Sequence, residues 1–174
     1  LRPLGLRLRL RKAEFELLQA QINPHFLYNT LDAIIWLAEA GEQKRVVGMV
    51  RNLSDFFRTS LNQGKDINSI KEEMLHVKSY LEIQHVRYQD ILSYDIEVPE
   101  ALYIYSIPKI TIQPLVENAI IHGLEGCDNG YICIYAAQKD GVLSISVTDD
   151  GCGMNQDMVD WINSPAPAKR DGHL

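Results

Sequence analysis

The chain has 174 residues, a formal net charge of -6, 46% hydrophobic residues and 23% charged residues. This length allows one ordinary domain or a small domain with a helical attachment, and the composition excludes an intrinsically disordered chain. The acidic balance argues against a general nucleic-acid binder, and without a run of about 18 apolar residues we expect no membrane span.

The first forty residues carry an apolar repeat with alternating steps of three and four, which is typical of the a/d seam of a coiled coil or helical bundle. A second helical pattern follows Gly41 and ends near Gly64. Since a single helical hairpin cannot bury its apolar face alone, we expect residues 1–66 to pair with a second copy as a dimeric four-helix bundle. The predicted seam consists of Leu10, Ala13, Leu17, Ala20, Pro24, Leu27, Leu31, Ile34 and Ala38.

Residues 67–174 predict a mixed α+β unit. Ser69 to Glu72 is a capping box, which indicates the start of a helix that runs to about Gln89. The other predicted elements are a strand at 91–98, a helix at 107–123 with Pro108 in its first turn, strands at 131–138 and 142–148 joined by a hairpin-like turn, a short helix at 154–162 and a mobile loop at 163–174.

His25 directly follows Pro24 in the middle of the predicted first helix. With Pro24 on the seam, His25 lies one step off it, where its imidazole faces water. A proline inside a helix kinks it and costs about 3 kcal/mol, which the display of His25 would offset. A neutral imidazole is a suitable phosphoryl acceptor, because its unperturbed pKa is about 6.5. Judged by position alone, a surface histidine beside a bundle proline remains the alternative.

Polar residues gather on the helix predicted at 107–123. Asn118 and His122 are four residues apart and share a face, with Glu117 beside them. An amide oxygen is a hard ligand that completes a Mg²⁺ shell alongside phosphate oxygens. Taken alone, this pattern is equally that of a polar helix face.

A carboxylate, Asp149, ends the last predicted strand and is followed by Gly151 and Gly153. A carboxylate at a strand end accepts a hydrogen bond from an exocyclic amine, and glycines let a ligand approach the backbone closely. Taken alone, this pattern is equally an ordinary strand-to-turn exit. Together with the amide-bearing helix, it predicts a two-layer nucleotide site.

These segments resemble known motifs. QPLVENAIIHG at 113–123 and DDGCGM at 149–154 are similar to the N box and the first glycine box of the Bergerat (GHKL) ATP-binding fold. LQAQINPHFLYNTL at 18–31 resembles the phosphoacceptor signature of LytS/YesM-type sensor histidine kinases, and the following DAIIW leans toward the YesM branch. The resemblance covers nearly all of residues 13–174.

The resemblance implies a dimerisation and histidine-phosphotransfer hairpin at 1–66 and a GHKL-type ATP-binding catalytic domain at 67–174, built as a two-layer α/β sandwich with a mixed sheet. It implies that His25 accepts the γ-phosphoryl group of ATP and that Asn118 holds Mg²⁺. The other implied site residues are Glu117 and His122 near the metal, Asp149 at the adenine amine, and Gly151 and Gly153 in the pocket wall.

The resemblance also implies partners. The phosphohistidine would pass its group to an aspartate on the receiver domain of a response regulator with an AraC-like DNA-binding output. Asn29, one turn after His25, would position water for removing phosphate from the regulator. We expect the chain to be the cytoplasmic portion of a bacterial inner-membrane sensor, with membrane segments before residue 1 and no direct contact with nucleic acid.

Some positions depart from the family pattern. Phe26 stands where many histidine kinases carry an acidic base, so the base is unassigned and Glu117 is the candidate. Pro114 and Asp150 also differ from the usual motif residues, and the chain stops at Leu174, where a second glycine box would begin. Two alternatives stay open: another GHKL-type ATPase, which needs no phosphoacceptor, and a non-catalytic dimeric signalling module with a degenerate nucleotide pocket.

Overall fold

The computed structural model describes residues 23–61, 66–89, 91–124, 129–153 and 155–164. They form an α+β fold with a mixed sheet, which confirms the predicted class. The elements in chain order are α2 (Pro24–Glu39), α3 (Gln43–Ser60), β1 (Ile67–Ser69), α4 (Ile70–Arg87), β2 (Leu92–Glu97), the 3-10 helix η1 (Glu100–Leu102), β3 (Ser106–Pro108), α5 (Gln113–Gly123), β4 (Gly130–Lys139), β5 (Val142–Asp149) and α6 (Gln156–Asn163).

Helix α2 begins at Pro24, so the predicted mid-helix kink at this proline is wrong. Asn23 has an extended backbone (φ -65°, ψ 108°), and its side chain accepts hydrogen bonds from the backbone N–H groups of His25 (3.1 Å) and Phe26 (3.4 Å). Proline in the first turn costs little, because its missing N–H would be unpaired there anyway. Hence no energetic cost at Pro24 has to be offset by displaying His25. The part of the predicted seam before residue 23 lies outside the described residues.

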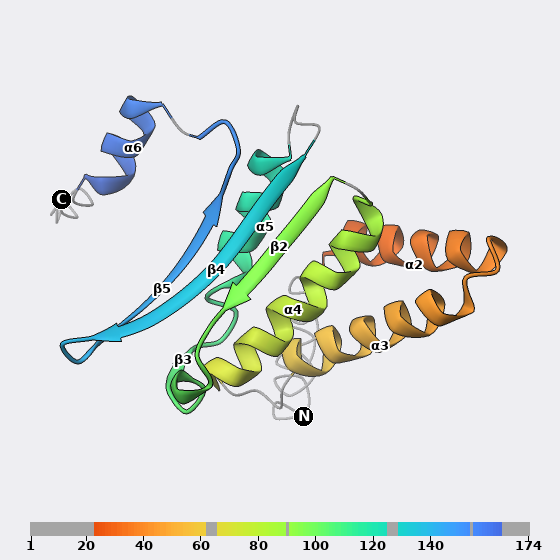
Figure 1. The fold of residues 1–174 in the computed structure, drawn as a ribbon, viewed down its shortest axis with the longest axis horizontal. Coiled ribbons are helices and arrows are strands. Elements are labelled where there is room, and N and C mark those ends of the chain that lie inside the picture. The colour runs from red at the N-terminus through yellow and green to blue at the C-terminus, as the bar shows by residue number, and fades with distance from the viewer. Residues whose placement is uncertain (1–22, 62–65, 90, 125–128, 154, 165–174) are drawn as a thin grey trace, which may run out of the picture.

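The face of α2 that packs within the protomer also differs from the predicted seam. Phe26, Thr30 and Leu37 are buried, whereas Leu31 and Ala38 of the seam are exposed. Helices α3 and α4 cover the stripe that carries Phe26 and Leu37, so the predicted seam is left largely uncovered. The α2–α3 pair forms the predicted hairpin (Figure 1), and Gly41 lies in its turn with φ 75°.

Helix α4 is the central element, since it lies between the sheet and the α2–α3 pair (Figure 1). It begins with the predicted capping box: the Ser69 hydroxyl accepts from the Glu72 N–H, and the Glu72 carboxylate accepts from the Ser69 N–H. Because neighbours cover it on several sides, polar as well as apolar side chains are buried along it. Its buried residues are Ile70, Glu73, Met74, His76, Val77, Ser79, Tyr80, Leu81, Ile83 and Gln84.

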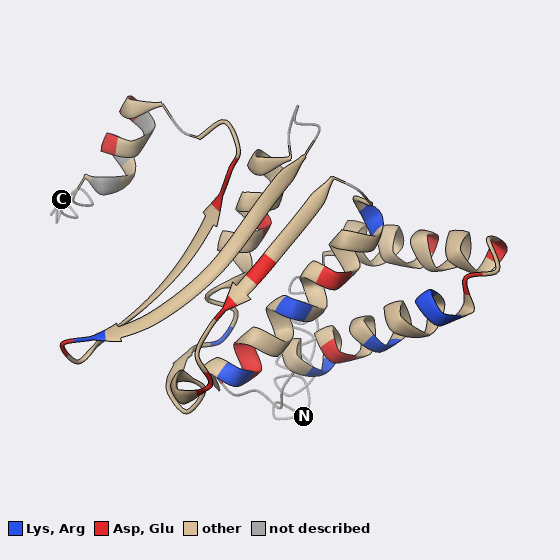
Figure 2. Ribbon diagram, in the orientation of Figure 1, with Lys and Arg blue, Asp and Glu red and all other residues tan. Residues whose placement is uncertain are grey.

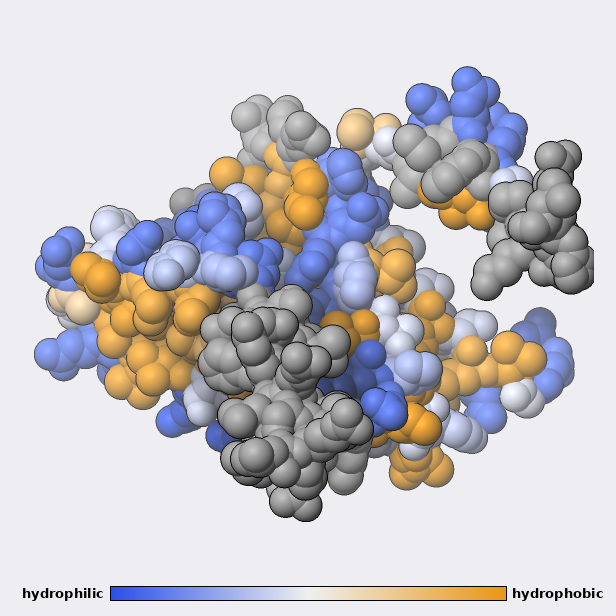
Figure 3. Space-filling view, turned by 180° about the vertical axis from the view of Figure 1, so that it is seen from behind, coloured by the Kyte–Doolittle hydropathy of each residue, from blue (hydrophilic) through white to orange (hydrophobic). Residues whose placement is uncertain are grey.

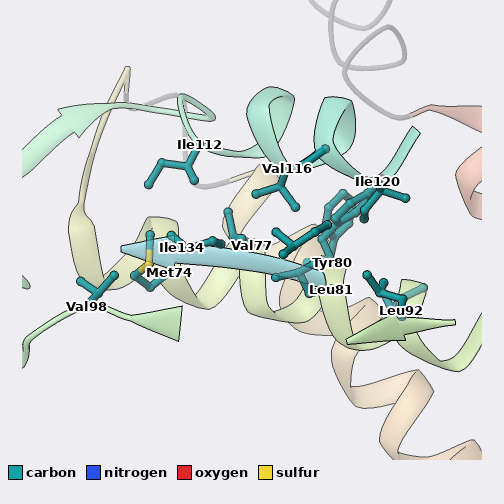
Figure 4. Packing of buried hydrophobic residues seen from close by; sticks show 14 of the residues in the cluster. Met74, Val77, Tyr80, Leu81, Leu92, Val98, Ile112, Val116, Ile120 and Ile134 are labelled. Atoms are coloured by element: carbon teal, nitrogen blue, oxygen red, sulfur yellow. The ribbon is translucent and has the colours of Figure 1, made fainter. Parts of the chain in front are cut away.

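The three-stranded sheet has the order β2-β4-β5, with β2 parallel and β5 antiparallel to β4. Along β4, alternate residues are buried and exposed, so the helices cover one face of the sheet. Figure 4 shows Val116 and Ile120 of α5, Val77 and Leu81 of α4, and Ile134 of β4 meeting in this core. The fold therefore has a helical layer packed on one face of a mixed sheet.

The turn between β4 and β5 is the predicted hairpin connection. Asp140 (φ 52°) and Gly141 (φ 77°) both have left-handed backbone conformations, as the two central residues of a type I′ turn require. The strands predicted at 91–98, 131–138 and 142–148 and the short helix predicted at 154–162 are confirmed within a few residues at each end.

The helix predicted to begin near Pro108 begins instead at Gln113, with Pro114 in its first turn. Residues 106–108 form β3, which pairs antiparallel with β1. Ile110 has a left-handed backbone (φ 57°), which no continuous helix accommodates. The prediction failed because the local pattern does not reveal pairing with a strand that lies far away in the sequence.

None of the helices in the described ranges combines the length and the apolar character needed to cross a bilayer.

Candidate functional site

His25 is exposed in the first turn of α2, and Asn29 lies one turn further along the same face, as predicted. The Asn29 amide nitrogen lies 3.1 Å from Nδ1 and 3.4 Å from Nε2 of the imidazole. The amide nitrogen is a donor, so in a neutral ring the nearer Nδ1 accepts and the ring proton is on Nε2. The ring is open to a reagent, but attack through Nε2 requires another group to remove that proton.

The two halves of the predicted nucleotide site meet in space. Asn118 and His122 are exposed on α5, which ends at Gly123 against the end of β5. A Cβ atom added at Gly123 would lie 3.4 Å from the Cβ of Asp149. The exposed Asp149 carboxylate accepts a hydrogen bond from the Gly151 N–H at 3.0 Å. The α5 C-terminus, the strand end and the glycine turn therefore form one continuous surface.

The two glycines of this turn are needed for different reasons. A Cβ atom at Gly151 would lie 2.6 Å from the Gly123 Cα and 2.9 Å from the His122 carbonyl oxygen, so the backbones are too close for any side chain. Gly153 has open space around it but a left-handed backbone (φ 69°). Asp150 anchors the turn to β4, since its carboxylate accepts from the Tyr131 N–H at 2.7 Å.

We expect Gly151→Ala to destabilise the fold by about 1–3 kcal/mol, because the new methyl group would push apart two backbone segments. Urea denaturation of the variant measures this loss. Gly48→Ala is the control: it lies inside α3 with no atom within 4 Å of an added Cβ, so we expect a gain of about 1 kcal/mol from helix propensity. Equal midpoints for Gly151→Ala and the wild type would contradict the close approach.

Within the described residues, neither α5 nor β5 carries a lysine or an arginine. The sequence has no lysine or arginine in 110–138 or in 140–153. Figure 2 shows the basic residues of the described ranges mainly on α3 and α4, away from Asp149 at the end of β5. A phosphate chain bound here would therefore depend on a metal ion for charge neutralisation. No cluster of three or more His, Cys, Asp or Glu residues that could hold a metal is found within the described ranges, so such an ion would take ligands from phosphate and water as well.

A cavity of about 250 Å³ separates the start of α2 from the start of α5. No hydrogen bond in the described part of the chain joins His25 to Glu117, Asn118 or Asp149. The candidate base Glu117 therefore lines this cavity, whereas the candidate acceptor His25 does not, although its neighbours Asn23 and Phe26 do. The cavity is lined by Asn23, Phe26, Phe56, Ile110, Gln113, Pro114 and Glu117.

Sequence reasoning missed a buried carboxylate that positions the segment before α5. Glu73 is fully buried, and one of its carboxylate oxygens accepts from the Asn68 amide (2.8 Å) and the Ile110 N–H (2.9 Å). The other oxygen accepts from the Thr111 N–H at 3.1 Å. The two bonds from the backbone hold the left-handed conformation at Ile110 and thereby set where α5 begins.

A buried histidine one turn further along α4 was also missed. Nδ1 of His76 lies 2.7 Å from the Thr59 hydroxyl of α3, Nε2 is hydrogen-bonded to Oε1 of Gln113 on α5, and the ring stacks on Phe56 at 4.6 Å. Burial lowers the pKa of His76, so the ring is neutral near pH 7. The available signal was the wide spread of apolar residues around α4, which indicates that polar residues between them are buried too.

Comparison with known proteins gives a consistent picture. Residues 13–92 match the model of the histidine kinase family. Sensor histidine kinase YesM of Bacillus subtilis (strain 168) is 42% identical over 147 residues, which are 84% of this chain and 26% of that protein. Sensor histidine kinase BtsS of Escherichia coli (strain K12) is 35% identical over 148 residues, which are 84% of this chain and 26% of that protein. Sensor protein LytS of Streptococcus agalactiae serotype V is 34% identical over 164 residues, 92% of this chain and 28% of that protein. The chain therefore spans about a quarter of the length of these curated relatives.

Proposed function

The chain belongs to the histidine kinase family of sensor proteins, and we propose that it takes part in ATP-dependent autophosphorylation on His25 followed by phosphoryl transfer to a response regulator. The observation that carries this proposal is the exposed imidazole of His25 in the first turn of α2, within the segment that matches the family model. The names of the relatives, which are sensor kinases and sensor proteins, support the same reading.

The transfer forms a bond between an imidazole nitrogen of His25 and the γ-phosphorus of ATP, while the bond from that phosphorus to the bridging oxygen breaks and ADP leaves. The ring proton has to pass to a base. Asn29 favours the tautomer with this proton on Nε2, and the neighbouring Phe26 has no group to accept it. Glu117 is the candidate base, because its carboxylate borders the cavity that extends to Asn23 and Phe26 at the start of α2.

The nucleotide would lie where α5 meets the end of β5. In this proposal Asp149 receives the adenine amine, Gly151 and Gly153 allow close approach of the ligand, and His122 lies near the phosphates. Asn118 offers an amide oxygen to Mg²⁺, which suits a hard cation that also binds phosphate. When bound, Mg²⁺ would supply the positive charge that the polypeptide lacks there, since residues 110–138 contain no lysine or arginine.

The fold supports a division of labour in which residues 1–66 provide a dimerising hairpin and residues 67–174 provide a Bergerat-type ATP-binding unit. Helices on one face of a mixed sheet fit that unit. Large apolar side chains are exposed on the hairpin, which carries a broad hydrophobic patch in Figure 3. Burial of this patch between two copies would form the four-helix bundle. The exposed residues include Leu31, Ile35 and Trp36 on α2 and Val47 and Val50 on α3.

The proposed setting is a bacterial inner-membrane sensor with this chain on the cytoplasmic side. Its partner would be a receiver domain whose regulator carries an AraC-like DNA-binding output. Asn29 lies beside His25, where an amide could orient water for removing phosphate from that regulator. The names of the relatives, which describe sensor proteins, support this setting.

We expect His25→Gln to abolish acid-labile, base-stable ³²P labelling of the full-length protein that contains this chain, because the nucleophilic nitrogen is removed. His85→Gln is the control: this histidine lies on α4 with Nδ1 2.7 Å from the Leu92 carbonyl oxygen, and its variant should label normally. Label that persists in His25→Gln would exclude His25 as the acceptor. ATP hydrolysis without labelled protein would favour another type of GHKL ATPase, and neither labelling nor nucleotide binding would favour a non-catalytic module.

A further inference from the structure

Resting on the proposed function, in which Glu117 takes the proton, we propose that His76 and Gln113 are positioning residues that hold the Glu117 carboxylate in its working orientation. Thr59 ties this set of residues to the C-terminal end of α3. The hydrogen bonds run from α3 through α4 to α5, so they connect the helical hairpin to the candidate base.

The directions of these hydrogen bonds follow from the chemistry of the end groups. The Gln113 amide nitrogen lies 2.6 Å from Oε1 of Glu117. An ionised carboxylate only accepts, so the amide nitrogen of Gln113 must face it and the amide oxygen must face His76. That oxygen in turn only accepts, which places the ring proton of His76 on Nε2. Nδ1 is then an acceptor. The Thr59 hydroxyl oxygen also lies 2.8 Å from the Asp55 carbonyl oxygen and 3.0 Å from that of Phe56, so in this arrangement its single proton points to Nδ1 at 2.7 Å and not to either carbonyl.

The surroundings of His76 keep this chain rigid. The ring is 1% exposed and stacks on Phe56 with an interplanar angle of 19°. The charged groups that act on it are Glu73, one turn earlier on α4, and Lys109, in the loop before α5; their effects on its pKa are opposite in sign. Because the ring is buried and neutral, it acts as a fixed donor to Gln113.

The chain of hydrogen bonds from Thr59 to Glu117 ends at the wall of the cavity, which gives it a role beyond packing. Gln113 and Glu117 line the same cavity as Asn23 and Phe26, which immediately flank the Pro24–His25 pair. A shift in the last turn of α3 would reach Glu117 through Thr59, His76 and Gln113. The geometry of the base would thus depend on the position of the hairpin, which is the part of the chain that we propose dimerises.

The test uses the full-length protein that contains this chain and measures three quantities: the autophosphorylation rate at saturating ATP across about pH 5–9, the ATP dissociation constant and the unfolding temperature. Gln113→Met keeps the volume but removes the amide, and His76→Phe keeps a ring against Phe56 but removes both hydrogen bonds. We expect the rate of each to fall by about tenfold to a hundredfold with unchanged ATP affinity, since misplaced catalytic groups lose rate without losing binding.

Gln113→Glu tests the positioning role through the pH dependence of the rate, which would not change if Gln113 served only in packing. It still accepts from His76, but it places a second carboxylate against Glu117 and therefore raises the pKa of that group. Because the base works in its ionised form, the acid limb of the rate profile should shift to higher pH by about one unit or more. This variant also keeps the test open if His76→Phe fails to fold. Glu117→Gln should lose the contribution of this carboxylate to the acid limb.

Ser79→Ala is the matched control, because Ser79 is buried on α4 like His76, and among the described residues its hydroxyl bonds only the Leu75 carbonyl oxygen of the same helix, at 2.8 Å. Its rate and pH profile should equal those of the wild type. Folded Gln113 and His76 variants with a wild-type rate and an unshifted acid limb would overturn the positioning role, as would a wild-type rate in Glu117→Gln. If His25 were still labelled in either case, the proposed function would stand. A wild-type protein that is not labelled would overturn both the proposed function and the positioning role.

Discussion

Replacing Glu73 with alanine is expected to destabilise the fold by about 3–5 kcal/mol, because a fully buried acceptor of three hydrogen bonds is lost. The N–H groups of Ile110 and Thr111 and the amide of the buried Asn68 would be left without their partner. Each buried donor without an acceptor costs about 1–3 kcal/mol, and the contributions are not additive. Denaturant unfolding measures the total.

Glu73→Gln refines this prediction. It keeps the shape of the side chain but replaces one carboxylate oxygen by an NH₂ group. That group is a donor and faces an N–H group that bonded to the carboxylate, so we expect a loss of about 1–3 kcal/mol. Glu82→Gln on the same helix is the control: Glu82 is half-buried and accepts from the Tyr94 hydroxyl at 2.6 Å, which an amide oxygen does equally well. Equal stabilities of Glu73→Gln and Glu82→Gln would show that the buried bonds contribute little.

The Glu73 variants should also lower autophosphorylation, because the bonds to Ile110 and Thr111 define where α5 starts. If α5 lost its starting point, Gln113 and Glu117 would both be displaced from the cavity wall. A fall in rate at temperatures well below unfolding would separate this local effect from global loss of the fold.

Phe56→Ala is expected to cost about 3–5 kcal/mol, the range for truncating a buried phenylalanine. Phe56 is 5% exposed, and its ring centroid lies 4.9 Å from that of Phe26 on α2, 4.6 Å from that of His76 and 6.1 Å from that of Tyr80, both on α4. One side chain thus joins three helices, and its removal opens a cavity between them. The unfolding temperature of the variant measures this loss.

Phe57→Ala is the matched control in the same helix. Phe57 is only half-buried, so truncating it leaves a smaller cavity, and we expect a loss of roughly half that of Phe56→Ala. Equal losses at the two positions would show that the ring cluster does not bind the hairpin to α4.

Much of the fold was predictable because its signals are local. The capping box at Ser69 and Glu72 begins α4 as expected, since both hydrogen bonds lie within four residues. The Asp140–Gly141 turn closes the β4–β5 hairpin because both residues tolerate a left-handed backbone. Asn29 lies beside His25 because residues four apart share a helix face.

The motif resemblance grouped two segments that lie side by side in the structure. It paired the α5 segment that carries Asn118 with the turn after Asp149, and the structure brings Gly123 and Gly151 into close backbone contact there. The wrong predictions fall at the starts of α2 and α5. Pro24 and Pro114 each begin a helix, whereas the sequence pattern alone placed Pro24 inside one and started the other at Pro108.

The amino-acid sequence alone specifies the capping box of α4, the β4–β5 hairpin turn, the strand at β4 and the identity of the motif residues, because each depends on neighbours a few positions away. Only the tertiary structure decided that Glu73 and His76 are buried, that Ile110 takes a left-handed backbone, and that the chain from Thr59 to Glu117 exists. Apart from the bond between Gln113 and Glu117, which are four residues apart, the hydrogen bonds that join Thr59, His76 and Gln113 and those from Glu73 to Ile110 and Thr111 link residues between 17 and 38 positions apart. The free energy that creates them comes from satisfying buried polar groups, and which groups are buried is settled only when the helices pack.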